Sequence, residues 1–563
     1  MPMFTLGINA AFHDSAAALL KDGQIIAAAE EERFTHIKHG KRPIPFSAYE
    51  MPYHAIDYCL KTADIHINDV DHFAYSFDPD LLKESGFISN GAAIYHSWDE
   101  LFLTYIEQAA LQVQDGYPHH LQKRFIGAKD IQEKWHYVEH HIAHAASAYY
   151  PSPFQKAAVM IMDGRGEKIS TSYYLGEGNE MKRLGTVHMP HSLGMLYEKI
   201  TTYLGFLHSS DEYKVMALAS YGQPLYTNNF MSAIHLSTDG TYTTNNFNPE
   251  DWWGPQRKRE EPFTQLHFDI AHSLQKALEK SVVHLANWLY EETQTENLCL
   301  AGGIALNCVL NSVIKEQSPF KNVWVQPAAG DAGTALGAAL WVDVRLNSDE
   351  QSDKSTNEMV HAYWGPSYSD EEVEAFLQWT KVPYRKLDNV AKDTARILAQ
   401  NKIIGWYQGR MEFGPRALGS RSILASPIEA SMQTRLNDIK DREDFRPVAP
   451  VVLEEDAHDW FENASFSPFM LFVYPVKEDK ADKIPAVRHV DGTARIQTIN
   501  RQQHALYYDL LSEFKGFTGV PVLVNTSFNT RGEPVVCTPR DAIECFWTSP
   551  FDALVINSFL LEK

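Results

Sequence analysis

Residues 157–176 read AAVMIMDGRGEKISTSYYLG, which is an apolar strand, a glycine-bearing turn and a second strand. The same order recurs over residues 4–29, where an apolar strand and a polar loop precede two short strands that flank Lys21-Asp22-Gly23. Asp-Gly between two apolar runs is a strong signal for a hairpin turn. Two units that begin with the same strand order predict an internal duplication within an α/β fold.

Further strands and helices follow this duplicated pattern. The segments 297–316 and 323–342 each combine an apolar strand, a Gly/Ala-rich loop and a helical pattern, an arrangement that presents backbone N–H groups to phosphates in α/β folds. Apolar spacing over 268–291 predicts a long amphipathic helix. The polar stretch NSDEQSDKSTNE, 347–358, predicts a linker.

The linker predicts two domains, 1–355 and 356–563. The second domain alternates helical patterns with apolar strands, so it is also expected to be α/β. Its helices are expected over 370–380 and 391–400, and its strands over 403–407 and 520–524.

Composition describes a globular protein with an acidic excess. A chain of 563 residues is too long for one core, so two or three domains are expected. Its 72 acidic and 50 basic residues give a net charge of -22, which disfavours binding to nucleic acid or to an anionic membrane. The five cysteines include no CxxC pair and suit reduced thiols. The start of the chain has no basic region typical of a signal peptide, and no run of 18 apolar residues occurs, so a soluble, cytoplasmic protein is expected.

The segment GRMEFGPRALGSRS, 409–422, sets Arg410, Arg416 and Arg421 among glycines, small residues and a proline. Guanidinium groups held by a tight backbone suit a planar dianion such as phosphate or carbamoyl phosphate, because each can donate two parallel hydrogen bonds. The alternative is that these arginines form surface salt bridges. Similar segments downstream contain Arg446, Arg495 and Arg531.

The segment EHHIAHAASAYY contains a candidate metal site. His140 and His144 are four residues apart, so on a helix they project from one face and can share an ion, whereas His141 points about 100° away. Asp163 ends one apolar strand, and Asp331 lies at the start of a helix. Two nitrogen and two oxygen donors suit Fe(II), Mn(II) or Zn(II) better than Ca²⁺. For Asp331 alone, a helix N-cap is the alternative.

Motifs along nearly the whole chain resemble one enzyme family. In chain order they are NAAFHD, EEERFTHIKHG, HHIAHAASAYY, MDGRGE, AGGIALN, GDAGTALGAA, GRMEFGPRALGSRS, KDREDFRPVAP, ARIQT and NTSFNTRGEP. They are similar to the motifs of ATP-dependent O-carbamoyltransferases, the group that contains nodulation protein U and the cephalosporin and tobramycin carbamoyltransferases. The resemblance implies an α/β protein, α+β overall. An N-terminal duplicated actin/sugar-kinase-like ATPase fold would hold the metal and transfer the carbamoyl group, and a fused C-terminal YrdC-like α/β domain would form carbamoyladenylate.

The resemblance also implies roles for single residues. Its metal ligands fall on His140, His144, Asp163 and Asp331, with Fe(II) as the metal, and its catalytic histidine falls on His13. The residues implied for binding ATP with Mg²⁺, and carbamoyl phosphate, are Lys38, Asp163, Gly164, Gly302, Gly303, Asn307, Arg416, Arg446, Arg495, Asn529 and Arg531. From the residues alone, His13 could instead be a loop histidine that hydrogen-bonds Asp14, and Lys38 a solvated lysine in a basic patch.

These assignments give a mechanistic hypothesis. The arginines bind carbamoyl phosphate, phosphate leaves, and the retained carbamate attacks the α-phosphate of ATP to give carbamoyladenylate and pyrophosphate. The metal would act as a Lewis acid on the adenylate, while His13 takes the proton from an acceptor hydroxyl. Relatives that accept polycationic aminoglycosides carry an aspartate directly before FHD, and Ala11 stands there in this chain, which favours a neutral or anionic, sugar-containing acceptor.

Three other functions stay open at this point. An ATP-binding scaffold would explain the N-terminal half but not the arginines, and a sugar kinase would need no carbamoyl phosphate. The third function, tRNA threonylcarbamoylation, is disfavoured by the net charge of -22. The expected partners are therefore carbamoyl phosphate and a small hydroxyl-bearing acceptor, with no nucleic acid and no membrane, and a homodimer is left open.

Overall fold

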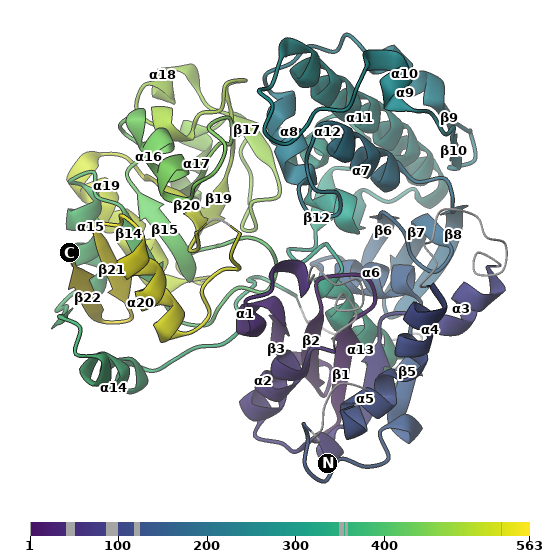
Figure 1. Cartoon of the computed structure of the whole chain (residues 1–563), viewed down its shortest axis with the longest axis horizontal. Helices are drawn as coiled ribbons and strands as arrows, with labels where there is room; N and C mark the ends of the chain where they lie inside the picture. The colour runs from purple at the N-terminus through teal and green to yellow at the C-terminus, as the bar shows by residue number, and fades with distance from the viewer. Residues whose placement is uncertain are drawn as a thin grey trace. The chain divides into compact units, whose positions relative to one another are not determined.

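The computed structural model describes residues 2–40, 51–85, 99–116, 124–347, 354, 358–530 and 532–563. Two compact units divide the chain, Met1–Met359 and Val360–Lys563 (Figure 1). Most of the predicted linker, and Arg531 of the predicted anion site, lie outside the described residues. Within those residues, no helix is both long enough and apolar enough to cross a membrane.

The described residues of the first unit form two five-stranded sheets with the same topology, β3-β2-β1-β4-β5 and β8-β7-β6-β11-β12. In each sheet the first three strands in chain order form an antiparallel meander, and the last two run parallel to the first. The strands are β1 Phe4–Asn9, β2 Ala16–Lys21, β3 Gln24–Glu30, β4 His72–Tyr75, β5 Trp135–Tyr137, β6 Lys156–Met162, β7 Ile169–Glu177, β8 Glu180–His188, β11 Asn297–Ala301 and β12 Asn322–Val325. The predicted duplication is therefore confirmed.

The helices of this unit cover the sheets. They are α1 Glu32–Thr35, α2 Tyr53–Ala63, α3 Pro79–Glu84, α4 Asp99–Glu107, α5 Ala109–Asp115, α6 His140–Tyr149, α7 Leu193–Tyr203, α8 Glu212–Ala219, α9 Thr227–Ala233, α10 Pro249–Trp253, α11 Gln265–Thr293, α12 Cys308–Gln317 and α13 Ala332–Asn347. A small ribbon of β9 Ile234–Leu236 and β10 Tyr242–Thr244 completes the unit. The long helix predicted over 268–291 is α11, which extends a few residues further at both ends.

Helices α6 and α13 pack so closely that only small residues fit between them. A Cβ atom at Gly337 of α13 would lie 1.7 Å from the carbonyl oxygen of Ala143 of α6. On the sheet side, a Cβ atom at Gly7 of β1 would lie 1.8 Å from the carbonyl oxygen of Ala335 of α13. These contacts fix α13 between the first sheet and α6 (Figure 1). They bring the start of α13 close to the first turns of α6.

The second unit is built on an eight-stranded mixed sheet of order β13-β22-β21-β14-β15-β20-β16-β19. Its strands are β13 Arg385–Lys386, β14 Ile404–Tyr407, β15 Arg421–Ala425, β16 Ala449–Leu453, β19 Gln497–Ile499, β20 Val522–Ser527, β21 Ala553–Ile556 and β22 Phe559–Glu562, with a separate pair, β17 Val473–Pro475 and β18 Thr493–Arg495. Its helices are α14 Asp370–Thr380, α15 Val390–Leu398, α16 Ser431–Ile439, α17 Glu454–Trp460, α18 Glu478–Ala481, α19 Ala505–Thr518 and α20 Pro539–Thr548. The predicted helix 370–380 matches α14, which begins with a capping box between Ser369 and Glu372. The strand expected over 520–524 is shifted to β20, after Pro521.

Candidate functional site

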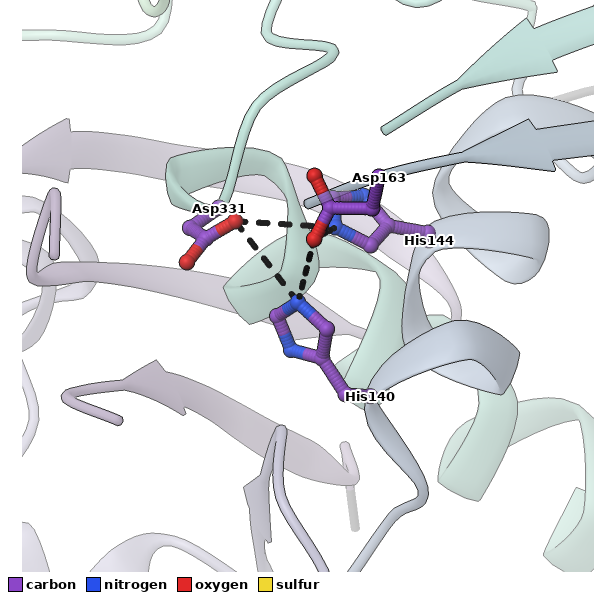
Figure 2. A group of neighbouring side chains, drawn as sticks. All are labelled: His140, His144, Asp163 and Asp331. Atoms are coloured by element: carbon purple, nitrogen blue, oxygen red, sulfur yellow. Dashed lines mark ion pairs between the residues drawn. The ribbon is translucent and has the colours of Figure 1, made fainter. Parts of the chain in front are cut away.

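Four buried side chains from three separate segments converge in the first unit (Figure 2). His140 and His144 project from α6, Asp163 follows the end of β6, and Asp331 immediately precedes α13. The Nε2 atom of His140 lies 3.4 Å from Asp163 Oδ2 and 3.6 Å from Asp331 Oδ1. The Nε2 atom of His144 lies 3.9 Å and 3.7 Å from the same two oxygens. The structure thus brings together the four residues that the sequence indicated as metal ligands.

Hydrogen bonds around the cluster fix which atoms point into it. His140 Nδ1 donates to the carbonyl oxygen of Ser76 at 3.2 Å, so its Nε2 faces the carboxylates and carries the lone pair when the ring is neutral. The backbone N–H of Gly303 donates to Asp163 Oδ1 at 2.8 Å, which leaves Oδ2 for the histidines. His141 is buried on another side of α6 and pairs with Ser172 Oγ at 2.9 Å. The alternative that Asp331 serves only as a helix cap does not explain why its Oδ1 lies between the two histidine nitrogens.

The electrostatics of the cluster favour a bound cation. Asp331 is 1% exposed, and both histidines are fully buried. Burial alone would raise the pKa of Asp163, but attraction to the nearby His140 and His144 outweighs it and lowers that pKa to about 2. Burial likewise opposes the charged form of His140, yet Asp331 and Asp163 raise its pKa well above the ordinary value. Two buried carboxylates therefore demand positive charge nearby.

The residues of the cluster fit a divalent metal ion. The Nε2 atoms of His140 and His144 are buried, face the carboxylates and have no hydrogen-bond partner among the described residues. One oxygen each from Asp163 and Asp331 completes a set in which all four donor atoms lie within 4.8 Å of one another. Nitrogen and oxygen donors in this proportion suit Fe(II), Mn(II) or Zn(II).

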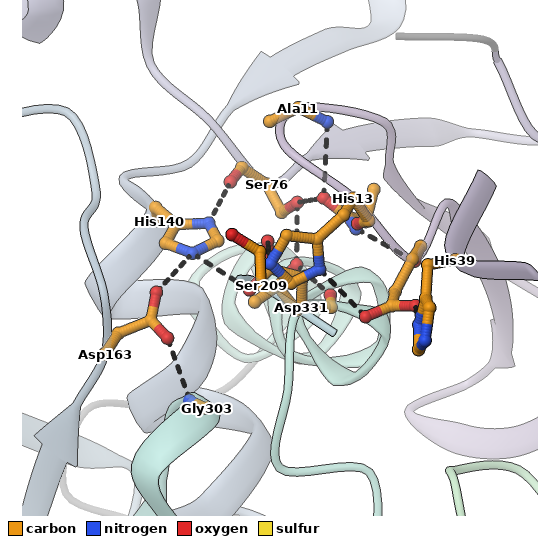
Figure 3. Close-up of polar contacts among 12 residues, drawn as sticks. Ala11, His13, His39, Ser76, His140, Asp163, Ser209, Gly303 and Asp331 are labelled. Atoms are coloured by element: carbon orange, nitrogen blue, oxygen red, sulfur yellow. Dashed lines mark hydrogen bonds and ion pairs between the residues drawn. The ribbon is translucent and has the colours of Figure 1, made fainter. Parts of the chain in front are cut away.

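His13 lies beside Asp331 of the cluster, in the polar loop after β1 (Figure 3). Its side chain is 29% exposed, and its Nε2 lies 3.8 Å from Asp331 Oδ2. Its Nδ1 lies 2.8 Å from Asp14 Oδ2. The loop histidine does pair with its neighbour, as the alternative expected, and it also faces the four proposed metal ligands.

The resemblance also implies that Gly302, Gly164 and Lys38 bind the nucleotide, and these residues lie in different environments. Gly302 has φ 89, and a Cβ atom there would lie 2.2 Å from the carbonyl oxygen of Met162, so the turn that leads Gly303 to Asp163 requires glycine. Gly164 directly follows Asp163. Lys38 is half-buried at the start of a short 3₁₀ turn.

The Asn307 side chain stabilises the structure around the start of α12. Its Oδ1 accepts from the backbone N–H of Leu310 at 3.0 Å, which caps α12. Its Nδ2 donates to Gln275 Oε1 at 2.8 Å. Both ends of the Asn307 side chain are therefore engaged within the protein.

In the second unit, the sheet gathers the residues implied for carbamoyl phosphate. Strand β20 runs antiparallel to β15 and β16, and β19 runs parallel to β16. The end of β20 and the starts of the other three strands therefore lie at the same edge. The residues beside these strand ends are Arg416, Arg446, Arg495 and Asn529.

One side chain links two of these segments. Asn525 Nδ2 donates to the carbonyl oxygen of Ala417 at 3.2 Å and to Gln497 Oε1 at 2.8 Å. The segments that contain Arg416 and Arg495 are thus held next to each other. The Nε atom of Arg495 is buried and has no hydrogen-bond partner among the described residues. The Nη1 atom of Arg446 lies 3.6 Å from Glu443 Oε2.

Arg421 does not belong to the candidate anion site, which corrects the expectation from GRMEFGPRALGSRS. It is fully buried, and its Nη1 donates to the carbonyl oxygens of Gln408 and Ser420 at 2.8 Å and 3.2 Å. Its guanidinium also lies 3.6 Å from the centre of the Tyr407 ring. Arg410 likewise donates to a backbone carbonyl, that of Trp364 at 2.7 Å. Two of the three arginines of this loop therefore donate to backbone carbonyl groups, most of them outside the loop.

Lys440 and Glu412 were not predicted from the sequence. Lys440 is 6% exposed, and its Nζ donates to Asn529 Oδ1 at 2.6 Å and to the carbonyl oxygen of Ser527 at 2.6 Å. The Glu412 carboxylate accepts from the backbone N–H groups of Leu418 and Ser420 at 2.7 Å and 2.8 Å. Both lie inside quoted motifs, but the pattern does not distinguish a buried charged side chain from a solvated one.

Comparisons with known proteins agree with this arrangement. Residues 5–340 match a family model described as "Carbamoyltransferase N-terminus", and residues 395–563 match "Carbamoyltransferase C-terminus". The Synechocystis sp. protein "Uncharacterized protein sll1178" is 41% identical over 99% of this chain and 96% of its own. "Nodulation protein NolNO" of Sinorhizobium fredii is 39% identical over 99% and 80%, and "Nodulation protein U" of Rhizobium fredii is 31% identical over 95% and 91%.

A solved structure of component A of (R)-2-hydroxyglutaryl-CoA dehydratase from Acidaminococcus fermentans also matches. Its TM-score is 0.34 at 14% identity, and the match covers 62% of this chain and all of the other. This similarity adds nothing to the fold already given by the order of the strands.

Proposed function

The chain belongs to the carbamoyltransferase family, and on that premise we propose that it makes carbamoyladenylate from carbamoyl phosphate and ATP and transfers the carbamoyl group to a hydroxyl oxygen. The observation that carries this proposal is the convergence of His140, His144, Asp163 and Asp331 beside His13. Such a site can hold a metal ion and a base close to one reacting group. That combination assists transfer to an acceptor hydroxyl that is only weakly acidic.

The second unit supports the donor half of the reaction. Arg416, Arg446 and Arg495 lie beside neighbouring strand ends and offer charge-assisted hydrogen bonds to a dianion. In this step water hydrolyses carbamoyl phosphate to phosphate and carbamate, and a carbamate oxygen then attacks the α-phosphate of ATP. Pyrophosphate leaves, and the arginines stabilise the charge that develops on the phosphoryl oxygens. Lys440 keeps Asn529 at this edge through its 2.6 Å hydrogen bond.

The first unit supports the transfer half. His13 Nε2 accepts the proton of the acceptor hydroxyl, the acceptor oxygen bonds to the carbamoyl carbon, and AMP leaves with the electrons of the broken carbon–oxygen bond. The ion held by His140, His144, Asp163 and Asp331, which we propose to be Fe(II), would supply Lewis-acid polarisation when bound. Lys38, Gly302 and Gly303 are proposed to contact the adenylate, and Mg²⁺ would accompany ATP.

The acceptor is proposed to be a neutral or anionic molecule that contains a sugar. Ala11 is fully buried in the loop that contains His13, so that position supplies no carboxylate for a cationic acceptor. A histidine base also suits a hydroxyl group, whereas an amine would need less help with deprotonation.

The products of ATP turnover test the proposal. With carbamoyl phosphate and ATP, the enzyme should release AMP and pyrophosphate and label an added glycoside with the carbamoyl group. A sugar kinase would release ADP, and an ATP-binding scaffold would release neither product above background. Radiolabelled carbamoyl phosphate offered with methyl glucoside, an aminoglycoside and a free amine then identifies the acceptor class. Preferential labelling of the aminoglycoside or the amine would overturn the proposed acceptor.

A further inference from the structure

His13 and His39, both labelled in Figure 3, pair with the same carboxylate, that of Asp14. We infer that Asp14, braced by His39, is a positioning residue that holds His13 in the orientation and tautomer required of a base. The inference rests on the proposed role of His13. It gives functions to two residues that the mechanism above does not use.

The distances define a chain of three side chains. Asp14 Oδ2 lies 2.8 Å from His13 Nδ1, and Asp14 Oδ1 lies 2.9 Å from His39 Nδ1. A carboxylate only accepts, so each histidine must donate its Nδ1–H to it. His13 then carries its lone pair on Nε2, the nitrogen that lies 3.8 Å from Asp331 Oδ2. Because His39 occupies the second oxygen, the carboxylate cannot turn away from His13 without losing a hydrogen bond.

The backbone holds Asp14 in place from both sides. Asp14 has φ 51, a left-handed conformation that aspartate and asparagine tolerate better than most residues. Its N–H donates to the carbonyl oxygen of His39 at 3.1 Å. Asn9 Nδ2 donates to the carbonyl oxygens of His13 and Asp14 at 3.0 Å and 3.1 Å. The loop is therefore closed by bonds that do not depend on the charge of Asp14.

The same network reaches one of the proposed metal ligands. Ser76 Oγ donates to Asn9 Oδ1 at 3.1 Å, and the carbonyl oxygen of Ser76 accepts from His140 Nδ1 at 3.2 Å. Ser76 thus contacts both the loop of His13 and a proposed metal ligand (Figure 3). A continuous set of hydrogen bonds sets the position of the base relative to the cluster.

His39 is itself held by its neighbours. Its N–H donates to Glu32 Oε2 at 2.6 Å, and the other oxygen of Glu32 lies 2.8 Å from Arg33 Nη1. His39 has φ 60, so a replacement must also tolerate a left-handed backbone. Asparagine and aspartate both do so. They have nearly the same shape, but asparagine can donate a hydrogen bond to Asp14 and aspartate cannot.

That pair of variants gives the main experiment. Single-turnover transfer is measured with carbamoyladenylate as donor and methyl glucoside as hydroxyl probe, and enzyme-dependent hydrolysis of carbamoyladenylate supplies the same readout with water as nucleophile. H39N should keep the rate within about 3-fold, and H39D should lose about 10-fold or more, because it places an acceptor against Asp14. Asp14→Asn should lose about 10²–10⁴-fold in rate with little change in the KM for the probe, since an amide cannot accept from both histidines.

A double-mutant comparison separates positioning from a structural role. If Asp14 acts through His13, Asp14→Asn should cost nothing further in a His13→Ala background. Additive losses in the double variant, or equal rates for H39N and H39D, would overturn the inference. Asp22→Asn is the matched control, because Asp22 also has a left-handed backbone, with φ 49, but lies in the hairpin turn away from the site. Full transfer by His13→Ala would instead overturn the proposed role of His13.

Discussion

Removal of the His144 side chain should abolish metal binding without breaking any hydrogen bond to the described residues. Neither ring nitrogen of His144 has a hydrogen-bond partner among the described residues, and its Nε2 faces Asp163 and Asp331. His140 is a poorer choice, since its Nδ1 also bonds Ser76. His141 is the matched control, because it lies on the same helix and is equally buried but bonds Ser172. The variants are therefore His144→Ala and His141→Ala.

The expected change in Tm follows from the stabilisation that a bound ion gives to the folded state. An ion at 100 times its Kd stabilises the folded state by about 2.7 kcal/mol. Unfolding of the first unit, Met1–Met359, carries an entropy of roughly 0.75 kcal/mol per kelvin at about 2.1 cal/mol/K per residue. Chelation should therefore lower the Tm of that unit by about 4 °C in the native protein. Removal of a residue that only hydrogen-bonds a metal ligand weakens metal affinity by about 10–100-fold. Loss of the ligand His144 itself should weaken it at least as much, which leaves less than about 0.5 kcal/mol of stabilisation and a change in Tm on chelation below about 1 °C.

The assay combines elemental analysis with thermal unfolding before and after treatment with EDTA. The native protein and His141→Ala should contain about one ion per chain and show the chelator shift, whereas His144→Ala should show neither. Stoichiometric metal in His144→Ala, or loss of metal in His141→Ala alone, would refute the assignment of the ligands. A general loss of folding would lower the starting Tm of both variants together, which distinguishes it from loss of the site.

Three further outcomes are expected. Arg416→Ala should reduce carbamoyl phosphate-dependent AMP formation by about 10²–10⁴-fold, because it removes charge-assisted hydrogen bonds. The variant should still transfer the carbamoyl group from supplied carbamoyladenylate. Loss of both half-reactions in a folded variant would contradict the assignment of adenylate formation to the second unit. Burial lowers the pKa of His504 to about 4, so this side chain is protonated in the unfolded chain before it is protonated in the folded protein as the pH falls from 6.5. The second unit should therefore lose about 3 kcal/mol of stability by pH 4. H504N can still cap its helix, and in urea titrations it should show a weaker dependence of stability on pH. Gly337→Ala should destabilise the first unit by at least about 1–3 kcal/mol and lower its metal content, since its Cβ would collide with the carbonyl group of Ala143 beside His144; an unchanged Tm would contradict the close packing.

Local patterns in the sequence predicted many elements of the fold. The hairpin at Lys21-Asp22-Gly23 and helix α14 appear where the sequence predicts them, because turn residues and capping boxes act over a few positions. The duplication was visible because both repeats begin with the same strand and turn order. The i, i+4 spacing of His140 and His144 is likewise a property of one helix.

Contacts between distant segments were decided only by the tertiary structure. The same loop contains Arg416 and Arg421, yet Arg421 is buried among backbone carbonyls, and nothing in its sequence neighbourhood distinguishes the two. Whether a charged side chain meets a ligand or the protein depends on which carbonyl groups the folded backbone leaves without donors. The pairing of Asp14 with His39, 25 positions away, is of the same kind. Sequence determines which groups are present in a loop, whereas burial and hydrogen bonding across the fold determine which of them remain available for chemistry.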